Sequence, residues 1–364
     1  MKIDHVHFYT RNAARTRDWF IDKIGFKAIG NCIGQDTHTE VIALNSACFV
    51  ISSPLNQTSP VAEYLNSHPS GIVDIAFRVP NLAEIINRAC SLNIRLLQDM
   101  QLWRSPESNS RDSFQFAQIA GWNGLRHTLV ETKEELDYCL PCLPLEINHH
   151  QITSKNTHSF PSYITNIDHV VLNVAQGKLD SAVKLYQTLF KFKVQQNFNI
   201  HTNKSGLTSA ALIDARGEVQ FNINQPTSTN SQIQEFIEVN GGSGIQHLAL
   251  RSQNLIADVN QMQQRNLAFL TVPQAYYRSL KQLLPLNTAE KKAISQQQIL
   301  VDCDRTSPQS LLMQIFTQPI FEQPTFFLEF IERRQEAQGF GQGNFQALFE
   351  AVEREQGKRI INSR

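Results

Sequence analysis

The sequence has no excess of charge of either sign and no long apolar run. Its 364 residues contain 33 Lys and Arg and 33 Asp and Glu, so no electrostatic attraction to nucleic acid or to an anionic membrane is predicted. No apolar stretch approaches the roughly 20 residues that a membrane-spanning helix requires. The N-terminal Met1-Lys-Ile-Asp-His5 enters a strand pattern without a signal-peptide core. The sequence therefore predicts a cytoplasmic protein that neither inserts into membranes nor binds nucleic acid.

Cysteine gives no evidence for a disulfide framework or a structural zinc site. The cysteines are scattered, and only Cys139-Leu-Pro-Cys142 has the spacing of a redox or metal pair. A zinc site of this type needs a second such pair, and a thioredoxin-like site opens a helix directly after a strand. Neither context is present in this proline-rich stretch, so both residues are interpreted as free thiols.

Three polar residues lie inside short apolar stretches that are typical of buried strands. They are His169 in 167–172, His247 in 244–250 and Glu329 in 326–331. Burying an unpaired imidazole or carboxylate costs several kcal/mol, and a bound metal ion would offset that cost. Two imidazoles and one carboxylate form the facial triad that leaves coordination positions open on Fe(II). The alternative is that these are three independently hydrogen-bonded residues of a core.

A repeat divides the chain. Ile3-Asp-His-Val6 recurs as Ile167-Asp-His-Val170, and a stretch with helical periodicity follows each copy. In the second stretch one apolar helix face has i, i+3, i+4, i+7 spacing and consists of Ala182, Leu185, Tyr186 and Leu189. Both stretches lead into short strands rich in β-branched residues. A further strand follows in each half, and a second helix is expected near 81–92 and 255–266.

These elements predict an α+β fold of two pseudo-repeated halves, each made of two βαβββ modules. A chain of this length exceeds one typical core, which also favours two domains. The expected boundaries are residues 1–132 for the first half and 166–364 for the second. Residues 133–165 are rich in Pro, Asn, His and Ser and are interpreted as the linker.

The repeat provides an internal control for the triad. Matching the halves places His5 at the position of His169, Asp74 at that of His247 and Thr128 at that of Glu329. The first half therefore lacks the set of two histidines and one carboxylate, although the surrounding apolar pattern is retained. We expect the first half to be degenerate and metal-free and the second half to be active. The alternative is that the two halves differ at these positions only because their sequences drifted independently.

Six short motifs of the second half complete the pattern. They are Ser231–Gln234, Gly244–Leu250, Pro273–Tyr277, Leu312–Pro319, Phe326–Arg333 and Gly339–Phe345. With these motifs, and over nearly the whole chain, the sequence resembles the 4-hydroxyphenylpyruvate dioxygenase family of the vicinal-oxygen-chelate superfamily. The last three motifs, in this order, are the most specific.

The resemblance implies a fold, a cofactor and a reaction. Each half would form an open β-barrel, and one Fe(II) per chain would be held by His169, His247 and Glu329. The reaction would convert 4-hydroxyphenylpyruvate and O₂ to homogentisate and CO₂, in tyrosine catabolism or in the supply of quinone and tocopherol precursors. A homodimer or homotetramer is expected.

The resemblance also carries pocket residues over, position by position. The candidate catalytic residues are Gln232, Gln314 and Asn224, whose carboxamides are candidates for binding the phenol hydroxyl of the substrate. The candidate substrate-binding residues are Ser209, Gln246, Phe316, Phe327, Phe340, Asn344 and Phe345. Gln246 adjoins His247 and would point to the opposite face of a regular strand. Taken alone, the amides are equally typical of strand edges and the phenylalanines of an ordinary core.

A C-terminal closing helix is predicted over about residues 340–356. Its apolar face consists of Phe345, Leu348, Phe349 and Val352. Three preceding glycines, Gly339, Gly341 and Gly343, permit backbone angles that other residues resist. A helix on a glycine hinge favours a lid over the site, and the alternative is a helix docked permanently on the core.

Two other functions fit the same pattern. A 4-hydroxymandelate synthase has the same substrate, metal and fold but hydroxylates the benzylic carbon, and only a few pocket contacts separate the two enzymes. A non-catalytic binding protein of this fold would lack the metal, so iron content would identify it. Extradiol catechol dioxygenases need additional pocket histidines and glyoxalases a second carboxylate ligand, and neither feature was found.

Overall fold

The computed structural model describes residues 1–104, 113–133, 136, 138–141, 162–202, 205–280, 286–304, 307–335, 337–341, 343–344, 347–348, 350–352 and 354. Three residues or segments of interest lie outside this part: Cys142, Phe345 and most of the expected linker. Cys139 is a free, buried thiol, as predicted.

The first half contains two βαβββ modules in succession. Its elements are β1 (Lys2–Tyr9), α1 (Ala13–Ile24), β2 (Lys27–Ile33), β3 (Thr37–Leu44), β4 (Ala47–Pro54), α2 (Pro60–Leu65), β5 (Gly71–Arg78), α3 (Leu82–Ser91), β6 (Leu96–Arg104), β7 (Ser113–Ala120), the 3₁₀ turn Trp122–Gly124 and β8 (Arg126–Glu131). Helix α1 begins where the Asn12 side chain accepts a hydrogen bond from the amide of Arg15. It ends at Gly25, whose φ of +100° is readily adopted only by glycine.

The second half repeats this order and adds two helices. Its elements are β9 (Ile164–Asn173), α4 (Leu179–Phe190), β10 (Lys193–His201), β11 (Gly206–Ile213), β12 (Gln220–Pro226), α5 (Gln232–Asn240), β13 (Gly244–Ser252), α6 (Leu255–Gln264), α7 (Gln274–Leu280), α8 (Thr288–Gln297), β14 (Leu300–Asp304), β15 (Ser307–Phe316) and β16 (Phe327–Arg334). The expected apolar face of α4 is buried at Ala182, Tyr186 and Leu189.

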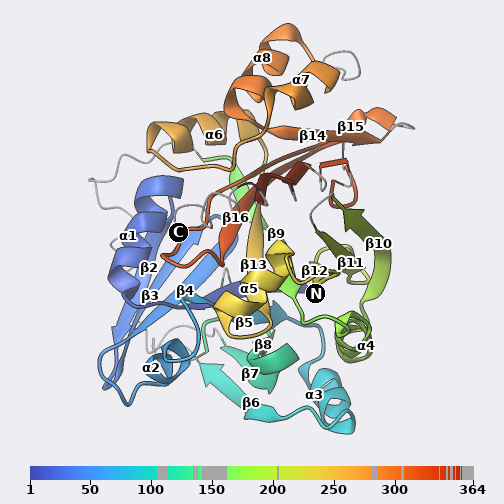
Figure 1. Ribbon diagram of the computed structural model, residues 1–364. Coiled ribbons are helices and arrows are strands. Elements are labelled where there is room, and N and C mark those ends of the chain that lie inside the picture. Colours follow the sequence, from blue (N-terminus) through green and yellow to red (C-terminus); the bar gives the residue numbers. More distant parts are fainter. Residues whose placement is uncertain are drawn as a thin grey trace.

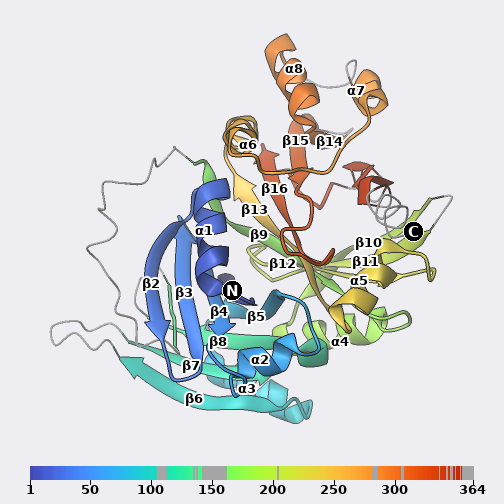
Figure 2. The ribbon, with the colours of Figure 1, turned by 60° about the vertical axis from the view of Figure 1, so that its left-hand side comes forward.

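Each half forms one eight-stranded sheet, and the two sheets have the same strand order. The orders are β2-β3-β4-β1-β5-β8-β7-β6 and β10-β11-β12-β9-β13-β16-β15-β14. The two modules of a half meet through an antiparallel pair, β1 with β5 or β9 with β13. The sheets curve in Figures 1 and 2, and their outer strands leave each barrel open. The predicted α+β fold of two pseudo-repeated halves is confirmed.

Helices α7 and α8 are an insertion that the sequence analysis did not include. They interrupt the last module between α6 and β14, and Figures 1 and 2 both place them beyond β14 and β15 at one end of the molecule. A sequence signal for α8 existed: the Asn287 side chain accepts from the amide of Glu290, whose carboxylate accepts from the amide of Asn287. This capping box is a recognisable helix start.

Aromatic side chains hold the two halves together. Phe8 of β1 packs against Phe326, just before β16, with ring centroids 5.4 Å apart. Elsewhere in the interface, the buried imidazole of His127 lies 3.1 Å from the hydroxyl of Tyr186 on α4. One continuous apolar cluster includes buried residues of both sheets. Burial of this surface fixes the relative position of the halves.

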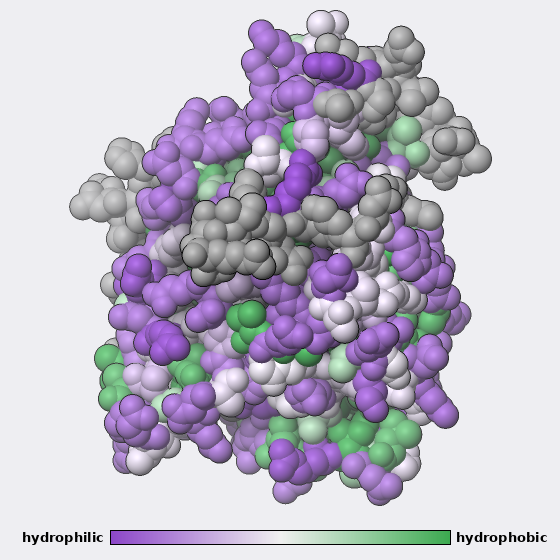
Figure 3. Space-filling view, viewed as in Figure 1, coloured by the Kyte–Doolittle hydropathy of each residue, from purple (hydrophilic) through white to green (hydrophobic). Residues whose placement is uncertain are grey.

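The face in Figure 3 is predominantly hydrophilic, and its hydrophobic side chains form small separate patches. Among the described residues, no helix is long and apolar enough to span a membrane.

Candidate metal centre

Three adjacent strands of the second sheet bring the predicted ligands together. His169 comes from β9, His247 from β13 and Glu329 from β16, which are neighbours in the sheet. The Nε2 atoms of His169 and His247 lie 3.1 and 3.3 Å from the same carboxylate oxygen, Oε2 of Glu329. All three side chains are buried, and their ligand atoms lie within 4.8 Å of one another. The three polar positions are therefore one cluster.

Hydrogen bonds fix the orientation of the His169 ring. Its Nδ1 lies 2.9 Å from Oδ1 of Asp168, a buried carboxylate that can only accept, so Nδ1 carries the proton. Asp168 also accepts from Nε and Nη2 of Arg333 at 2.8 and 2.6 Å. Burial by itself would raise the pKa of Asp168, but Arg333 and His169 hold it well below its usual range. Asp168 is therefore an anion that points Nε2 of His169 into the cluster.

The donor set fits a bound cation. With the Nδ1 proton donated to Asp168, the neutral His169 ring directs the lone pair of Nε2 at the Glu329 carboxylate, and two acceptors then face each other. A proton or a metal ion relieves this conflict. Burial disfavours charge at His169, yet the neighbouring Glu329 raises its pKa to about 9. Burial likewise disfavours the Glu329 anion, yet His169 lowers its pKa to about 2. Two imidazole nitrogens and one carboxylate oxygen suit a divalent transition metal.

The corresponding place in the first half contains a different network. The strand registers align β1, β5 and β8 with β9, β13 and β16, so Asp74 and Thr128 do occupy the positions of His247 and Glu329. Asp74 accepts hydrogen bonds from the amide of Thr128 at 2.9 Å, from its hydroxyl at 2.5 Å and from Nε2 of Gln118 at 2.8 Å. The Asp74 carboxylate therefore accepts hydrogen bonds from three neutral donors. Within the described residues, no second group of metal-ligating side chains occurs.

Three of the four candidate phenylalanines contact the ligand imidazoles. Phe327 stacks on His247 with centroids 4.9 Å apart, and Phe316 meets the same ring edge-on at 6.3 Å. Phe340 packs edge-on against His169 at 5.2 Å. Each of these phenylalanines is at most 5% exposed. They place apolar surface against both imidazoles and exclude water from those faces of the rings.

A group of polar residues faces His247 across a small cavity. The cavity is lined by Ile200, Leu207, Ser209, Asn224, Gln232, Gln246, His247, Phe327, Leu348 and Val352. Ser209 and Asn224 are cross-strand partners, and Nε2 of Gln246 donates to Oε1 of Gln232 at 2.7 Å. The Ser209 hydroxyl is buried and has no hydrogen-bond partner among the described residues. Four of the candidate residues therefore line one cavity. Among the described residues, the Ser209 hydroxyl has no acceptor for its proton.

Gln246 and His247 share this cavity although they are adjacent in the strand. The register of β13 against β9 shifts between Ile245 and His247, so Gln246 occupies a bulge. A bulge inserts one extra residue and breaks the regular alternation of faces. In a regular strand Gln246 would point to the opposite face from His247, and the bulge allows both side chains to reach the cavity. The sequence contains no clear signal for this bulge.

Gln314 and Asn344 lie on another side of the cluster. Nε2 of Gln314 donates to Oε1 of Glu329 at 2.8 Å and to the carbonyl of Phe340 at 3.1 Å. Its Oε1 accepts from Nδ2 of Asn344 at 2.8 Å. Gln314 is therefore not grouped with Gln232 and Asn224, and its amide orients the carboxylate of Glu329.

The C-terminal segment covers the cavity. Residues 343, 344, 347, 348, 350–352 and 354 are helical, three residues later than the expected start at 340. Gly339 and Gly341 have φ values of +83° and +73°. The cavity beside His247 is only about 30 Å³; it shares Leu348 with a second cavity of about 10 Å³ and Val352 with a third of about 20 Å³. Such volumes hold about one water molecule, so any larger ligand requires the segment to move.

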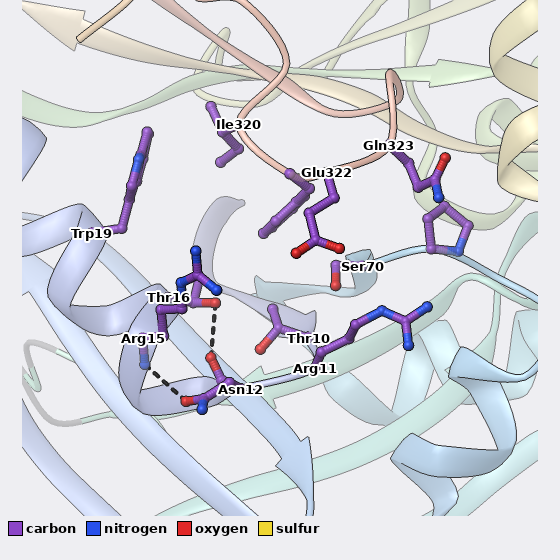
Figure 4. A pocket seen from close by; sticks show the side chains of 12 residues that line it. Thr10, Arg11, Asn12, Arg15, Thr16, Trp19, Ser70, Ile320, Glu322 and Gln323 are labelled. Atoms are coloured by element: carbon purple, nitrogen blue, oxygen red, sulfur yellow. Dashed lines mark hydrogen bonds between the residues drawn. The ribbon is translucent and has the colours of Figure 1, made fainter. Parts of the chain in front are cut away.

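A larger cleft lies away from this centre. It has a volume of about 180 Å³ and lies between the start of α1 and the loop Ile320–Gln323. Figure 4 shows Arg11, Arg15 and Glu322 extending around it, without any cluster of metal-ligating side chains. The metal centre is therefore not in the more open cleft.

The residues that support the candidate ligands were not predicted from the sequence. Asp168 and Arg333 hold His169, and Tyr276 of α7 holds Asn344. One signal was available, because an aspartate precedes the histidine in both copies of the repeat. The Asp4 carboxylate accepts from Nδ1 of His5 at 2.9 Å in the first half as well.

The chain is similar to known proteins over most of its length. The profile of the Glyoxalase/Bleomycin resistance protein/Dioxygenase superfamily matches residues 166–285. The 4-hydroxyphenylpyruvate dioxygenase of Caenorhabditis briggsae is 33% identical over 375 residues, covering 98% of this chain and 92% of that protein. An uncharacterised protein of Synechocystis is 33% identical over 355 residues, 97% of each chain.

A solved structure has the same fold over the whole chain. A triple mutant of 4-hydroxymandelate synthase from Streptomyces coelicolor superposes with a TM-score of 0.82 at 26% identity, covering 98% of both chains. Together with the full-length relatives, this establishes the family. The chain belongs to the 4-hydroxyphenylpyruvate dioxygenase family of the vicinal-oxygen-chelate superfamily and is an oxidoreductase of the dioxygenase class.

Proposed function

We propose that this protein converts 4-hydroxyphenylpyruvate and O₂ to homogentisate and CO₂, with one Fe(II) held by His169, His247 and Glu329. The observation that carries the proposal is the convergence of these three buried side chains beside a cavity that His247, a group of polar residues and Phe327 line together. The division into a metal-free half 1–132, a linker 133–165 and a catalytic half 166–364 is part of the same proposal.

Fe(II), when bound, supplies the open coordination positions and the redox chemistry through which a 2-oxo acid and O₂ react. The protein residues then have separate tasks. Asp168 keeps the proton on Nδ1 of His169, which leaves Nε2 as the ligand atom. Gln314 holds Oε1 of Glu329, which leaves Oε2 facing both imidazoles.

The polar group opposite the metal centre is suited to the phenol end of the substrate. The Ser209 hydroxyl has no hydrogen-bond partner in the part of the chain that the structure describes, and Asn224, Gln232 and Gln246 present amides to the same cavity. A buried donor without a partner is costly, so a ligand hydroxyl placed there would gain a hydrogen bond. Phe327 and Phe316 would flank the ring, and Phe340 would exclude water beside His169.

The C-terminal segment acts as a lid in this proposal. A ligand site for a molecule of drug size has a volume of about 300–1,000 Å³, far more than the cavity beside His247. Displacement of Leu348 and Val352 would join the small cavities into one pocket, and their return would seal the substrate from water. The candidate lid residue Phe345 lies outside the described residues.

Product analysis tests the proposal. Protein loaded with Fe(II) without oxygen is mixed with 4-hydroxyphenylpyruvate and air, and the aromatic product is identified. Homogentisate with one CO₂ per O₂ supports the proposal. Hydroxymandelate would identify a synthase activity, the alternative expected from the sequence and the activity in the name of the Streptomyces coelicolor neighbour. No product from a protein that retains iron would overturn both.

A further inference from the structure

A directional chain of hydrogen bonds leads from the metal centre to α7. Glu329 accepts from Gln314, Gln314 accepts from Asn344 at 2.8 Å, and Oδ1 of Asn344 accepts from the hydroxyl of Tyr276 at 2.9 Å. The carboxylate at one end can only accept, so every amide in the chain has one orientation. Tyr276 therefore supplies the first proton of a chain that ends on a metal ligand.

Among the described residues, the Tyr276 hydroxyl has two acceptors for its one proton. It lies 2.9 Å from Oδ1 of Asn344 and 3.0 Å from the carbonyl of Val301 on β14, and it accepts from the amide of Val301 at 2.8 Å. Burial raises the pKa of Tyr276, so the hydroxyl keeps its proton. When Asn344 moves away, the proton can turn to the Val301 carbonyl. The Tyr276 hydroxyl therefore keeps a hydrogen bond after Asn344 has moved away from it.

The neighbouring tyrosine has no such role. Tyr277 is more deeply buried than Tyr276, yet its hydroxyl has no hydrogen-bond partner among the described residues. The two rings contact each other edge-on, with centroids 5.0 Å apart. Tyr277 therefore contributes apolar packing in the same helix and is a matched control.

We propose that Tyr276 is a positioning residue that acts as a reversible latch for the C-terminal segment. In the closed state its hydroxyl holds Asn344, which holds the amide of Gln314 against Glu329 and the carbonyl of Phe340. In the open state the hydroxyl donates to Val301. The catalytic consequence rests on the proposed function, because closure matters only if a substrate is enclosed.

The test is a pair of variants, Tyr276→Phe and Tyr277→Phe, in the full-length chain. In Tyr276→Phe the buried Oδ1 of Asn344 loses its donor in the closed state only, and a cost of about 1 kcal/mol there changes the equilibrium about fivefold. Hydrogen exchange of the backbone amides in residues 337–344 of the metal-free protein should therefore be about fivefold faster in Tyr276→Phe. Exchange in Tyr277→Phe should equal that of the unaltered protein. Equal exchange in both variants would overturn the latch.

A double-mutant cycle separates the latch from support of β14. Tyr276→Phe also removes the partner of the Val301 amide. In an Asn344→Ala background, the effect of Tyr276→Phe on exchange of residues 337–341 should nearly vanish, because both changes break the same contact. Additive effects would show that Tyr276 acts through Val301 alone and would overturn the proposal.

Steady-state measurements examine the consequence for turnover. In Tyr276→Phe, Co(II) affinity should stay within about twofold, since Asn344 and Gln314 lie between Tyr276 and Glu329 in the chain of hydrogen bonds. The KM for 4-hydroxyphenylpyruvate should rise about fivefold, with more O₂ consumed per product formed. If exchange responds as expected while even the unaltered protein forms no homogentisate, the proposed function fails and the latch stands. If homogentisate forms and exchange does not respond, only the latch fails.

Discussion

Arg333 and Asp168 form a bidentate ion pair beneath the metal centre, with Nε and Nη2 donating at 2.8 and 2.6 Å. Nη1 of the same arginine donates to the carbonyl of Gly339 at 2.7 Å. One guanidinium therefore supports the aspartate that orients His169 and also the start of the C-terminal segment. Gln314 makes the equivalent double contact, to Glu329 and to the carbonyl of Phe340. The segment is tied to the residues that support two of the three ligands.

The ion pair gives the first prediction. Asp168→Asn removes the charge that holds the Nδ1 proton of His169, so the affinity for Fe(II) should fall about 10–100-fold. Anaerobic metal titration measures this. Asp4→Asn is the matched control, since Asp4 makes the same contacts with His5 and Arg78 in the half without a triad. Equal loss of metal in both variants would contradict a specific role of Asp168.

The triad gives the second prediction. His169→Ala, His247→Ala and Glu329→Ala should each leave a folded protein with little bound iron and no product, because each removes one of three ligands. Iron content and turnover are measured together. His5→Ala should retain both, since the adjacent Asp74 site is satisfied by Thr128 and Gln118. Near-normal turnover in any one ligand variant would refute the assignment.

A pair of glycines gives the third prediction. Gly341→Ala should reduce kcat at least about tenfold more than Gly339→Ala. Both residues have a positive φ, so the backbone strain is similar. A Cβ at Gly341 would lie 2.0 Å from Oε1 of Gln314, whereas one at Gly339 meets its nearest atom at 4.0 Å. Similar kcat values for the two variants would show that the segment tolerates displacement.

The interface between the halves gives a fourth prediction, on pH. Burial, opposed in part by Asp74, lowers the pKa of His127 from 6.5 to about 4. The unfolded chain therefore binds a proton at this residue below about pH 6.5, and the folded protein does so only near pH 4. The free energy of unfolding should fall as the pH is lowered through this window, by up to about 3 kcal/mol.

Denaturant unfolding at several pH values measures this loss. His127→Gln keeps a polar side chain at the interface but does not titrate, so its free energy of unfolding should depend less on pH between 6.5 and 4. The difference between the two proteins isolates His127 from the other titrating groups. Parallel pH profiles would show that His127 is not responsible.

Much of the architecture was predictable because it depends on local patterns. The recurrence of Ile-Asp-His-Val and the helical periodicity around Tyr186 indicated the halves and their modules. The cluster of His169, His247 and Glu329 was recognisable because a histidine or glutamate inside an apolar strand needs a compensating partner. Matching the repeat also placed Asp74 and Thr128 correctly, since equal strand registers preserve equal spacing. The family followed from the motifs.

The contacts between elements were decided only by the tertiary structure. The bulge that turns Gln246 toward His247 depends on how β13 pairs with β9, and strand alternation alone predicts the opposite face. Gln314 faces Glu329 because β15 pairs with β16, and Tyr276 reaches Asn344 through an inserted helix that lies far from it in sequence. Sequence patterns record burial and periodicity along the chain. They do not record which donor meets which acceptor after the strands have paired, and these pairings set the orientation of each ligand.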